Sequence, residues 1–228
     1  MIEATYIDHM GSDLSVVNAA RVSFGKGSEW DYEYPLSHKS GYKKLKPKDE
    51  RLINYLAKHK HISPFGHAFA SFHIKAPIFV ARQLVKHKFL RWNEISRRYV
   101  DDEPEFYTPD VWRGRSKDKK QGSDGVVALS AWALEGIDEY GTDYGEVCLH
   151  VYETLLREGV APEQARMVLP QSTMTEWYWS GSLDAFADMC RLRCAADTQA
   201  ETRLVADDIS KKMSELFPVS WAALLSNS

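Results

Sequence analysis

Hydrophobic and polar residues over the first 75 positions follow two different periods. Residues 2–7, IEATYI, alternate at every second position as a strand does, and a short helix capped by Asp13 is predicted to run through residues 16–24. A helical pattern returns over residues 49–59, and residues 68–75, AFASFHIK, alternate as a half-buried strand does. The period alone therefore predicts the order strand, helix, helix, strand.

A third helix is predicted to begin near Pro77, because proline suits the first turn of a helix. Its apolar positions recur at helical spacing, which turns one stripe toward the core. The opposite face then carries polar and cationic side chains one turn apart, and these are Arg82, Gln83, Lys86 and His87. Such a face is suited to holding a ligand.

The rest of the chain is predicted to contain two long loops and a helical C-terminal half. The loops span about residues 25–48 and 110–125, where polar residues and glycine interrupt any periodic pattern. Ser182 is placed to cap one late helix, and Thr198 with Glu201 predicts a capping box for the last long one. The order of elements favours an α+β fold over a doubly wound sheet.

Composition predicts one soluble globular domain over residues 1–228. Hydrophobic residues make up 44% and charged residues 27%, and no window approaches the roughly 18 continuous apolar residues of a membrane span. The N-terminus has no basic stretch followed by an apolar core, so we expect no secretory signal and a cytoplasmic location, in a bacterial or virus-infected host cell. Three cysteines, Cys148, Cys190 and Cys194, are too few and odd in number for a disulfide framework.

Cationic residues concentrate in residues 82–99, RQLVKHKFLRWNEISRRY. This segment holds six lysines and arginines and a single acid, Glu94, in a chain whose formal net charge is −3. A bound phosphate-bearing ligand would compensate this local excess of positive charge. The amide, imidazole and hydroxyl groups among the cations would recognise a base or a sugar, which favours a compact pocket for a mononucleotide.

Nucleic-acid binding and metal binding are competing interpretations. Lys86 to Trp92 interleaves cations with two aromatic rings as a stacking groove does, but the chain is net acidic, unlike most nucleic-acid binders. The histidines within residues 59–73 suggest zinc, yet no H-x-x-x-H or C-x-x-C spacing accompanies them, so no metal site is predicted. The chain also lacks a P-loop, a G-x-G-x-x-G fingerprint and a G-x-S-x-G elbow.

The basic segment resembles the signature of the flavin-dependent thymidylate synthases, which is R-H-R followed, after seven residues, by S. Here it stands as Lys86-His87-Lys88, seven residues, then Ser96. The similarity covers most of the chain outside the two loops. In the family's order, the similar blocks are residues 10–24, 55–83, 105–109, 165–170 and 192–201.

The resemblance implies both a fold and an activity. The fold is an α+β domain with an antiparallel sheet and surrounding helices, assembled as a homotetramer whose active sites are shared between chains. The activity is reductive methylation of dUMP to dTMP, with methylenetetrahydrofolate as one-carbon donor, FAD as redox cofactor and NADPH as reductant. No enzyme nucleophile is implied, in agreement with the lack of a conspicuous nucleophilic cysteine. The implied partners are these small molecules, with no nucleic acid and no membrane.

The resemblance also implies residue roles. Arg193 would stabilise negative charge on the uracil ring and Ser96 would line the dUMP pocket, so these two are the expected catalytic residues. The residues implied to bind dUMP are Arg82, Gln83, Lys86, Glu94, Ser96, Arg97, Arg98, Arg193 and, from a neighbouring chain, Arg166. The residues implied to bind FAD are His61, Ser63, Lys86, His87, Lys88, Glu94, Ser182 and Asp188.

Departures from the family pattern leave alternatives open. Both signature arginines are lysines, Lys86 and Lys88, which keep the charge but lose the planar fork of a guanidinium. Gly66 replaces a usual acid, and Asp197 stands where relatives often carry histidine. The alternatives are a pyrimidine nucleotide hydroxymethylase or dCMP-directed enzyme of the same fold, and a flavin-free relative that binds nucleotides or nucleic acid.

Overall fold

A four-stranded sheet forms the centre of the protein. The computed structural model describes residues 1–33, 42–100, 102–117, 122–133 and 143–226. Neighbouring strands are all antiparallel, in the order β1-β4-β8-β5. These strands are β1 (Glu3–Met10), β4 (Phe69–Pro77), β8 (Met174–Ser182) and β5 (Leu90–Glu94). The predicted α+β class with an antiparallel sheet is confirmed.

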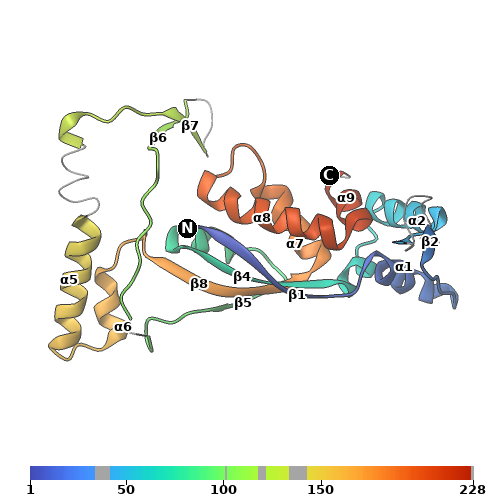
Figure 1. The fold of residues 1–228 in the computed structure, drawn as a ribbon, viewed down its shortest axis with the longest axis horizontal. Helices are drawn as coiled ribbons and strands as arrows, with labels where there is room; N and C mark the ends of the chain where they lie inside the picture. The colour runs from blue at the N-terminus through green and yellow to red at the C-terminus, as the bar shows by residue number, and fades with distance from the viewer. Residues whose placement is uncertain (34–41, 101, 118–121, 134–142, 227–228) are drawn as a thin grey trace.

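Helices and short hairpins surround this sheet. The helices are α1 (Asp13–Arg21), α2 (Pro47–Lys58), α3 (Ile78–Leu84), α5 (Asp143–Arg157), α6 (Pro162–Ala165), α7 (Leu183–Arg193), α8 (Ala200–Leu216) and α9 (Pro218–Ser226), with 3-10 turns η1 (Val22–Phe24), η2 (Ser63–His67) and η4 (Arg166–Val168). The hairpins pair β2 (Asp31–Glu33) with β3 (Tyr42–Lys44) and β6 (Arg113–Arg115) with β7 (Ser123–Val126). In Figure 1, α7 and α8 lie along one side of the sheet, α1, α2 and α9 gather at one end, and α5 and α6 stand beyond the other.

The core fills the space between the sheet and the helices on that side. Phe72 of β4 lies opposite Trp179 of β8, and Ile74 lies opposite Trp177, and all four are at most 1% exposed. The ring of Trp179 meets Phe186 of α7 edge to face, with centroids 5.6 Å apart. The alternation predicted for β4 is confirmed, because Ala70, Phe72 and Ile74 are buried whereas Ser71, His73 and Lys75 between and after them are partly exposed.

β8 contradicts the prediction that the C-terminal half is helical. Within its sequence MTEWYWSGS, Thr175, Trp177 and Trp179 are buried, whereas Tyr178 between the two tryptophans is exposed. This two-residue period and the aromatic content are strand signals. The segment is short and flanked by helical stretches, and its partners lie far away in the sequence, so it was missed even though it occupies a central position in the sheet.

α3 is shorter than its periodicity predicts. It ends at Leu84, and the KHK segment (residues 86–88) lies in the turn before β5, so the predicted helical face stops one turn early. The cause is strand pairing, because Leu90 lies opposite Gly181 of β8 and the chain must reverse beforehand. Phe89 completes the reversal with a φ of 64°, which is costly for any residue except glycine. A Cβ at Gly181 would come within 2.4 Å of Leu90 Cδ2 and 3.1 Å of the Phe89 carbonyl oxygen, so a larger residue there would force this turn to adjust.

Asp13 caps a different helix from the one predicted. The N-cap of α1 is Ser12, which forms a capping box with Ser15. The buried carboxylate of Asp13 instead accepts backbone N–H bonds from Val219 at 3.0 Å and Ser220 at 2.8 Å, in the first turn of α9. Asp13 therefore ties the N-terminal helix to the C-terminal one, a contact that local sequence does not reveal.

The other two predicted caps had different outcomes. Ser182 is the N-cap of α7, as predicted, although its side chain makes no capping hydrogen bond. The capping box at Thr198 is wrong, because α8 has Gln199 as its N-cap and the Thr198 hydroxyl donates to the carbonyl of Leu192 at 2.9 Å.

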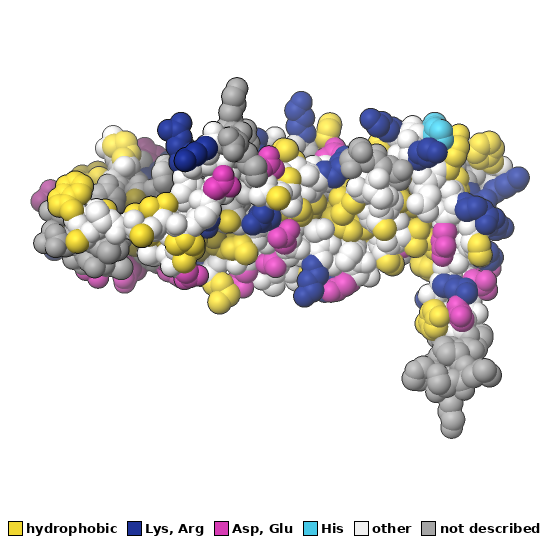
Figure 2. Space-filling model, turned by 90° about the horizontal axis from the view of Figure 1, so that it is seen from above, with side chains coloured by type: hydrophobic (Ala, Val, Ile, Leu, Met, Phe, Trp, Pro, Cys, Tyr) yellow, Lys and Arg dark blue, Asp and Glu magenta, His cyan; other side chains and the backbone are white. Residues whose placement is uncertain are grey.

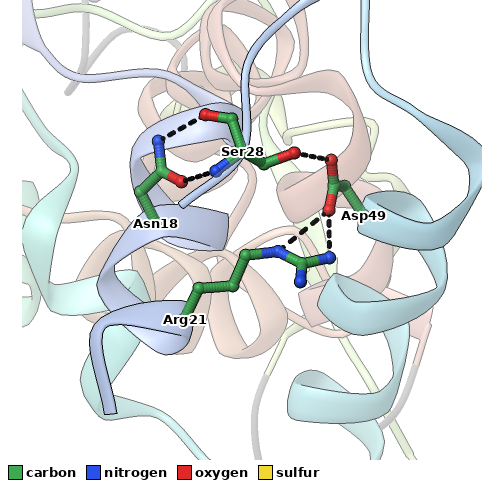
Figure 3. A network of polar contacts seen from close by, with 4 residues as sticks. All are labelled: Asn18, Arg21, Ser28 and Asp49. Atoms are coloured by element: carbon green, nitrogen blue, oxygen red, sulfur yellow. Dashed lines mark hydrogen bonds and ion pairs between the residues drawn. The ribbon is translucent and has the colours of Figure 1, made fainter. Parts of the chain in front are cut away.

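A buried polar network orders the start of the first predicted loop (Figure 3). The guanidinium of Arg21 donates to Asp49 Oδ1 through Nε at 3.1 Å and also through Nη2. The Ser28 hydroxyl donates to the other Asp49 oxygen, and Ser28 and Asn18 exchange two hydrogen bonds of 2.7 and 3.1 Å. The network joins α1, the segment after η1 and α2. Parts of the two predicted loops, residues 34–41 and 118–121, lie outside the described residues.

Candidate active site

Arg193 joins the end of α7 to the KHK turn. Its Nε donates to His87 Nε2 at 3.0 Å, and its Nη2 donates to the backbone carbonyl of Gln83 at 3.4 Å. The amide of Gln83 donates in turn to the side chain of Gln199. Arg193 and His87 are 106 residues apart in the sequence, so tertiary structure brings together two segments that the resemblance assigned to one site.

His87 is kept neutral by its surroundings. Burial, and secondly the positive charge of Arg193, lower its pKa from 6.5 to about 4. A neutral imidazole with its proton on Nδ1 has a lone pair on Nε2, which is what the N–H of Arg193 requires. Burial lowers the pKa of Arg193 as well, but an arginine pKa begins so far above neutrality that the side chain stays cationic.

We expect the imidazole of His87 to titrate at a pH of about 4, well below its ordinary value. Because the pKa is lower in the folded than in the unfolded protein, the unfolded chain takes up this proton first as the pH falls. His87 therefore leaves stability unchanged above about pH 6.5 and lowers it progressively toward about pH 4. An NMR titration assigned with a His87→Gln variant measures the pKa, and unfolding of both proteins over this range measures the stability. Titration near pH 6.5 would contradict the expectation.

Four exposed cations surround the same turn and have no acidic partner among the residues that the structure describes. They are Arg82, Lys86, Lys88 and Arg91. An unpaired, exposed cluster of this kind is open to phosphate groups. Figure 2, which looks down on the molecule from above, shows lysines and arginines interspersed with acidic side chains rather than a continuous basic surface. This surface does not have the basic stripe typical of nucleic-acid binders.

A second group of predicted site residues lines a small cavity beyond β5. Glu94, Arg97 and Arg166 line this cavity of about 130 Å³ together with Thr173 and Thr175. Arg166, in η4, thus lies beside Glu94 and Arg97 of its own chain. Five predicted nucleotide contacts lie in or closely after β5 or line this cavity, namely Glu94, Ser96, Arg97, Arg98 and Arg166, and only Glu94 belongs to the strand itself.

Ser96 and Arg98 lie just outside that cavity. The Ser96 hydroxyl oxygen accepts the backbone N–H of Arg98 at 3.3 Å. The guanidinium of Arg98 pairs with Glu163 of α6 at 3.2 Å. No hydrogen bond or ion pair joins Ser96 to Arg193, the two expected catalytic residues, in the described part of the chain.

Predicted flavin contacts form a third group near η2 and α7. His61 stacks on the ring of Tyr55 with centroids 6.1 Å apart, and Ser63 is exposed at the start of η2. Asp188 of α7 pairs with Arg191, and both line a cavity of about 400 Å³. Ser182 is buried at the start of α7 with 9% exposure, so it presents little surface to a ligand.

An aromatic cavity that the sequence did not predict lies beside Gln199. It measures about 470 Å³, and its walls include Phe79, Tyr107, Trp112, Arg113, Gln199 and Glu201. Glu201 is 4% exposed and accepts hydrogen bonds from Arg113 and, at 3.4 Å, from the Tyr107 hydroxyl. Burial acts to raise the pKa of Glu201, but the bond and charge of Arg113 outweigh it and lower the pKa. The signal for this cavity was the family similarity of residues 105–109 and 192–201.

The described residues contain no group of three or more His, Cys, Asp or Glu side chains that is placed to hold a metal ion. No helix in the same part of the chain is long and apolar enough to cross a membrane.

Comparison with known sequences shows a match over almost the whole chain. The family model described as "Thymidylate synthase complementing protein" matches residues 5–219. The flavin-dependent thymidylate synthase of Thermus thermophilus is 39% identical over 221 residues, which cover 95% of this chain and 73% of the relative. The enzyme of the same name from Thermosipho melanesiensis is 38% identical, with 96% and 88% covered.

Solved structures show the same relationship. A UMP/dUMP methylase, PolB from Streptomyces cacaoi, bound with 5-Br dUMP, superposes with a TM-score of 0.78 and 31% identity over 99% of this chain and 95% of that one. The same methylase bound with 5-Br UMP gives a TM-score of 0.80 at 30% identity, with 100% and 95% covered. The chain therefore belongs to the family of the flavin-dependent thymidylate synthases.

Proposed function

We propose that this protein converts dUMP to dTMP, with methylenetetrahydrofolate as the one-carbon donor, FAD as redox cofactor and NADPH as reductant. The observation that carries this proposal is the contact of Arg193 with His87 and the Gln83 carbonyl. This contact joins Arg193, which the resemblance places beside the pyrimidine, to the KHK turn, which the resemblance assigns to phosphate binding. Family membership and the similarity to a dUMP methylase support the same reaction.

Arg193 provides the electrostatic part of the mechanism. Its guanidinium would lie beside the uracil ring and stabilise negative charge at N3 and O4, which makes C5 a better nucleophile toward the methylene carbon. The neutral His87 ring and the Gln83 carbonyl hold two of its N–H groups and fix its orientation. Ser96 lines the nucleotide pocket, as do Arg97 and Arg98.

No thiol of this chain is required as a nucleophile. Cys148 and Cys190 are buried and Cys194 is partly buried. Burial raises the pKa of Cys190 well above its ordinary value, so its reactive thiolate form is disfavoured. The absence of a covalent enzyme intermediate is therefore consistent with the surroundings of these cysteines.

The exposed cations fit a diphosphate-bearing cofactor. Lys86 and Lys88 would bind the phosphates of FAD, and His61, Ser63 and Asp188 would contact the remainder of the cofactor. When bound and reduced by NADPH, the flavin would supply the hydride that reduces the transferred methylene to a methyl group. Arg82 and Gln83 remain available to the phosphate of dUMP.

We further propose a homotetramer with active sites shared between chains. Within one chain the candidate residues form separate groups, with no hydrogen bond or ion pair between the groups of Arg193 and Glu94 among the described residues. A neighbouring chain would bring complementary groups together, including Arg166. The molar mass in solution, measured by light scattering, tests the stoichiometry.

Product analysis tests the reaction directly. Purified protein should be yellow, and with NADPH and methylenetetrahydrofolate it should convert dUMP to dTMP, identified by mass spectrometry. Parallel incubations with dCMP and UMP separate the same-fold alternatives, and a hydroxymethylated product would identify a hydroxymethylase. A colourless protein that fails to bind added FAD and forms no dTMP would refute the proposal.

A further inference from the structure

Two neutral hydrogen-bond donors fix the carboxylate of Glu94. The hydroxyl of Thr175 donates to Oε1 at 2.7 Å, and Nε1 of Trp92 donates to Oε2 at 3.0 Å. Thr175 is 6% exposed in β8, and Trp92 in β5 stacks on Trp177 with centroids 4.2 Å apart and planes 19° apart. Both donors therefore have little freedom to move, and each carboxylate oxygen has a partner.

Two arginines line the same cavity as Glu94, yet they pair elsewhere. Arg97 bonds to Asp102 at 3.2 Å, and Arg166 donates to the backbone carbonyl of Glu163 at 3.3 Å. The described residues include no ion pair between Glu94 and either arginine. A mobile carboxylate beside two guanidinium groups would be expected to pair with one of them, because charge-assisted bidentate bonds are stronger than bonds to neutral donors.

We infer that Thr175 and Trp92 are positioning residues that keep Glu94 from pairing with Arg97 and Arg166. The carboxylate then stays available to accept an N–H or O–H group of the nucleotide's base or sugar, while Glu94 does not neutralise the two arginines, which can turn from their present partners to the phosphate. This inference rests on the proposed function, because the nucleotide is the ligand in question. It adds two residues that the family resemblance did not include.

Binding of dUMP to variants at position 175 tests the inference. Thr175→Val removes the hydroxyl with little change in volume, and it should weaken dUMP binding about tenfold or more, whereas Thr175→Ser should stay within about twofold of wild type. Deoxyuridine, which lacks the phosphate, should lose much less affinity. Thr5→Val is the control, because Thr5 also lies in the central sheet, but in β1, the edge strand opposite β5, and it does not line the cavity of Glu94. Isothermal titration measures all four proteins, with thermal melting to confirm folding.

A double variant and a crystal structure distinguish positioning from a general structural effect. In a Glu94→Gln background, Thr175→Val should cause no additional loss of dUMP affinity, because it acts through Glu94. The crystal structure of Thr175→Val should show the Glu94 carboxylate within ion-pair distance of Arg97 or Arg166. An unmoved carboxylate, or unchanged dUMP binding, would overturn the inference. If wild type binds no dUMP, the proposed function fails, and the crystal structure still decides whether Thr175 positions Glu94.

Discussion

Replacing Arg193 by alanine is expected to lower the turnover number at least about 100-fold while FAD stays bound. The guanidinium carries a fixed positive charge, unlike its neutral partner His87, and its bonds to His87 and the Gln83 carbonyl orient it. Alanine removes the charge that, in the proposed mechanism, stabilises negative charge on the uracil ring. It leaves Lys86 and Lys88, the proposed phosphate contacts, unchanged.

Single-turnover formation of dTMP and the flavin absorbance spectrum measure these two effects separately. Arg193→Lys should recover only part of the rate, because an ammonium keeps the charge but cannot make both bonds of the guanidinium. Arg157→Ala is a suitable control, because among the described residues Arg157 forms its side-chain bonds within its own helix, α5. Normal turnover in Arg193→Ala would remove this residue from the mechanism.

Sequence similarity could assign Arg193 and the KHK turn to one site, but it could not supply the contacts between them. Their hydrogen bonds depend on α7 ending where α3 turns toward β5, which is a tertiary relationship. The lowered pKa of His87 follows from that packing. The sequence could therefore indicate which residues belong to the candidate site. The charge state of His87 and the orientation of Arg193 could be read only from the fold.

Elements with a clear hydrophobic period within a short window were predicted best. The alternation of β4 and the helical pattern of α2 are visible in short windows. β8 was missed, and α3 was predicted too long, because both outcomes depend on pairing between β5 and β8, whose residues lie more than 80 positions apart. The donors that hold Glu94 were missed for the same reason, since Thr175 belongs to β8.

Packing in this chain does not explain the departure at Gly66. A Cβ added there would meet no atom within 4 Å, so the position has room for the acid that relatives carry. Asp197 is exposed, and a Cβ added to Gly122 would lie 2.6 Å from the backbone carbonyl of Asp197. The close approach thus involves the backbone, and the side chain at position 197 remains free to vary. These departures bear on ligand preference, which the parallel incubations with dUMP, dCMP and UMP address.

Removing the carboxylate of Asp49 is expected to lower the free energy of unfolding by about 3 kcal/mol. Asp49 is completely buried and accepts hydrogen bonds from Arg21 and Ser28. Asp49→Ala leaves the guanidinium of Arg21, whose side chain is only 19% exposed, without its counter-charge. It also removes the acceptor that fixes Ser28, so the segment after η1 loses its connection to α2.

Urea unfolding at a fixed protein concentration measures this loss, since oligomerisation would otherwise alter the apparent stability. Glu50→Ala is the matched control, because Glu50 also lies in the first turn of α2 but is exposed, so helix-dipole effects are similar in the two variants. Arg21→Met combined with Asp49→Leu should be more stable than either single variant, because no buried charge is left alone. Equal free energies of unfolding for Asp49→Ala and Glu50→Ala would show that the network fixes the positions of its side chains but adds no net stability to the fold.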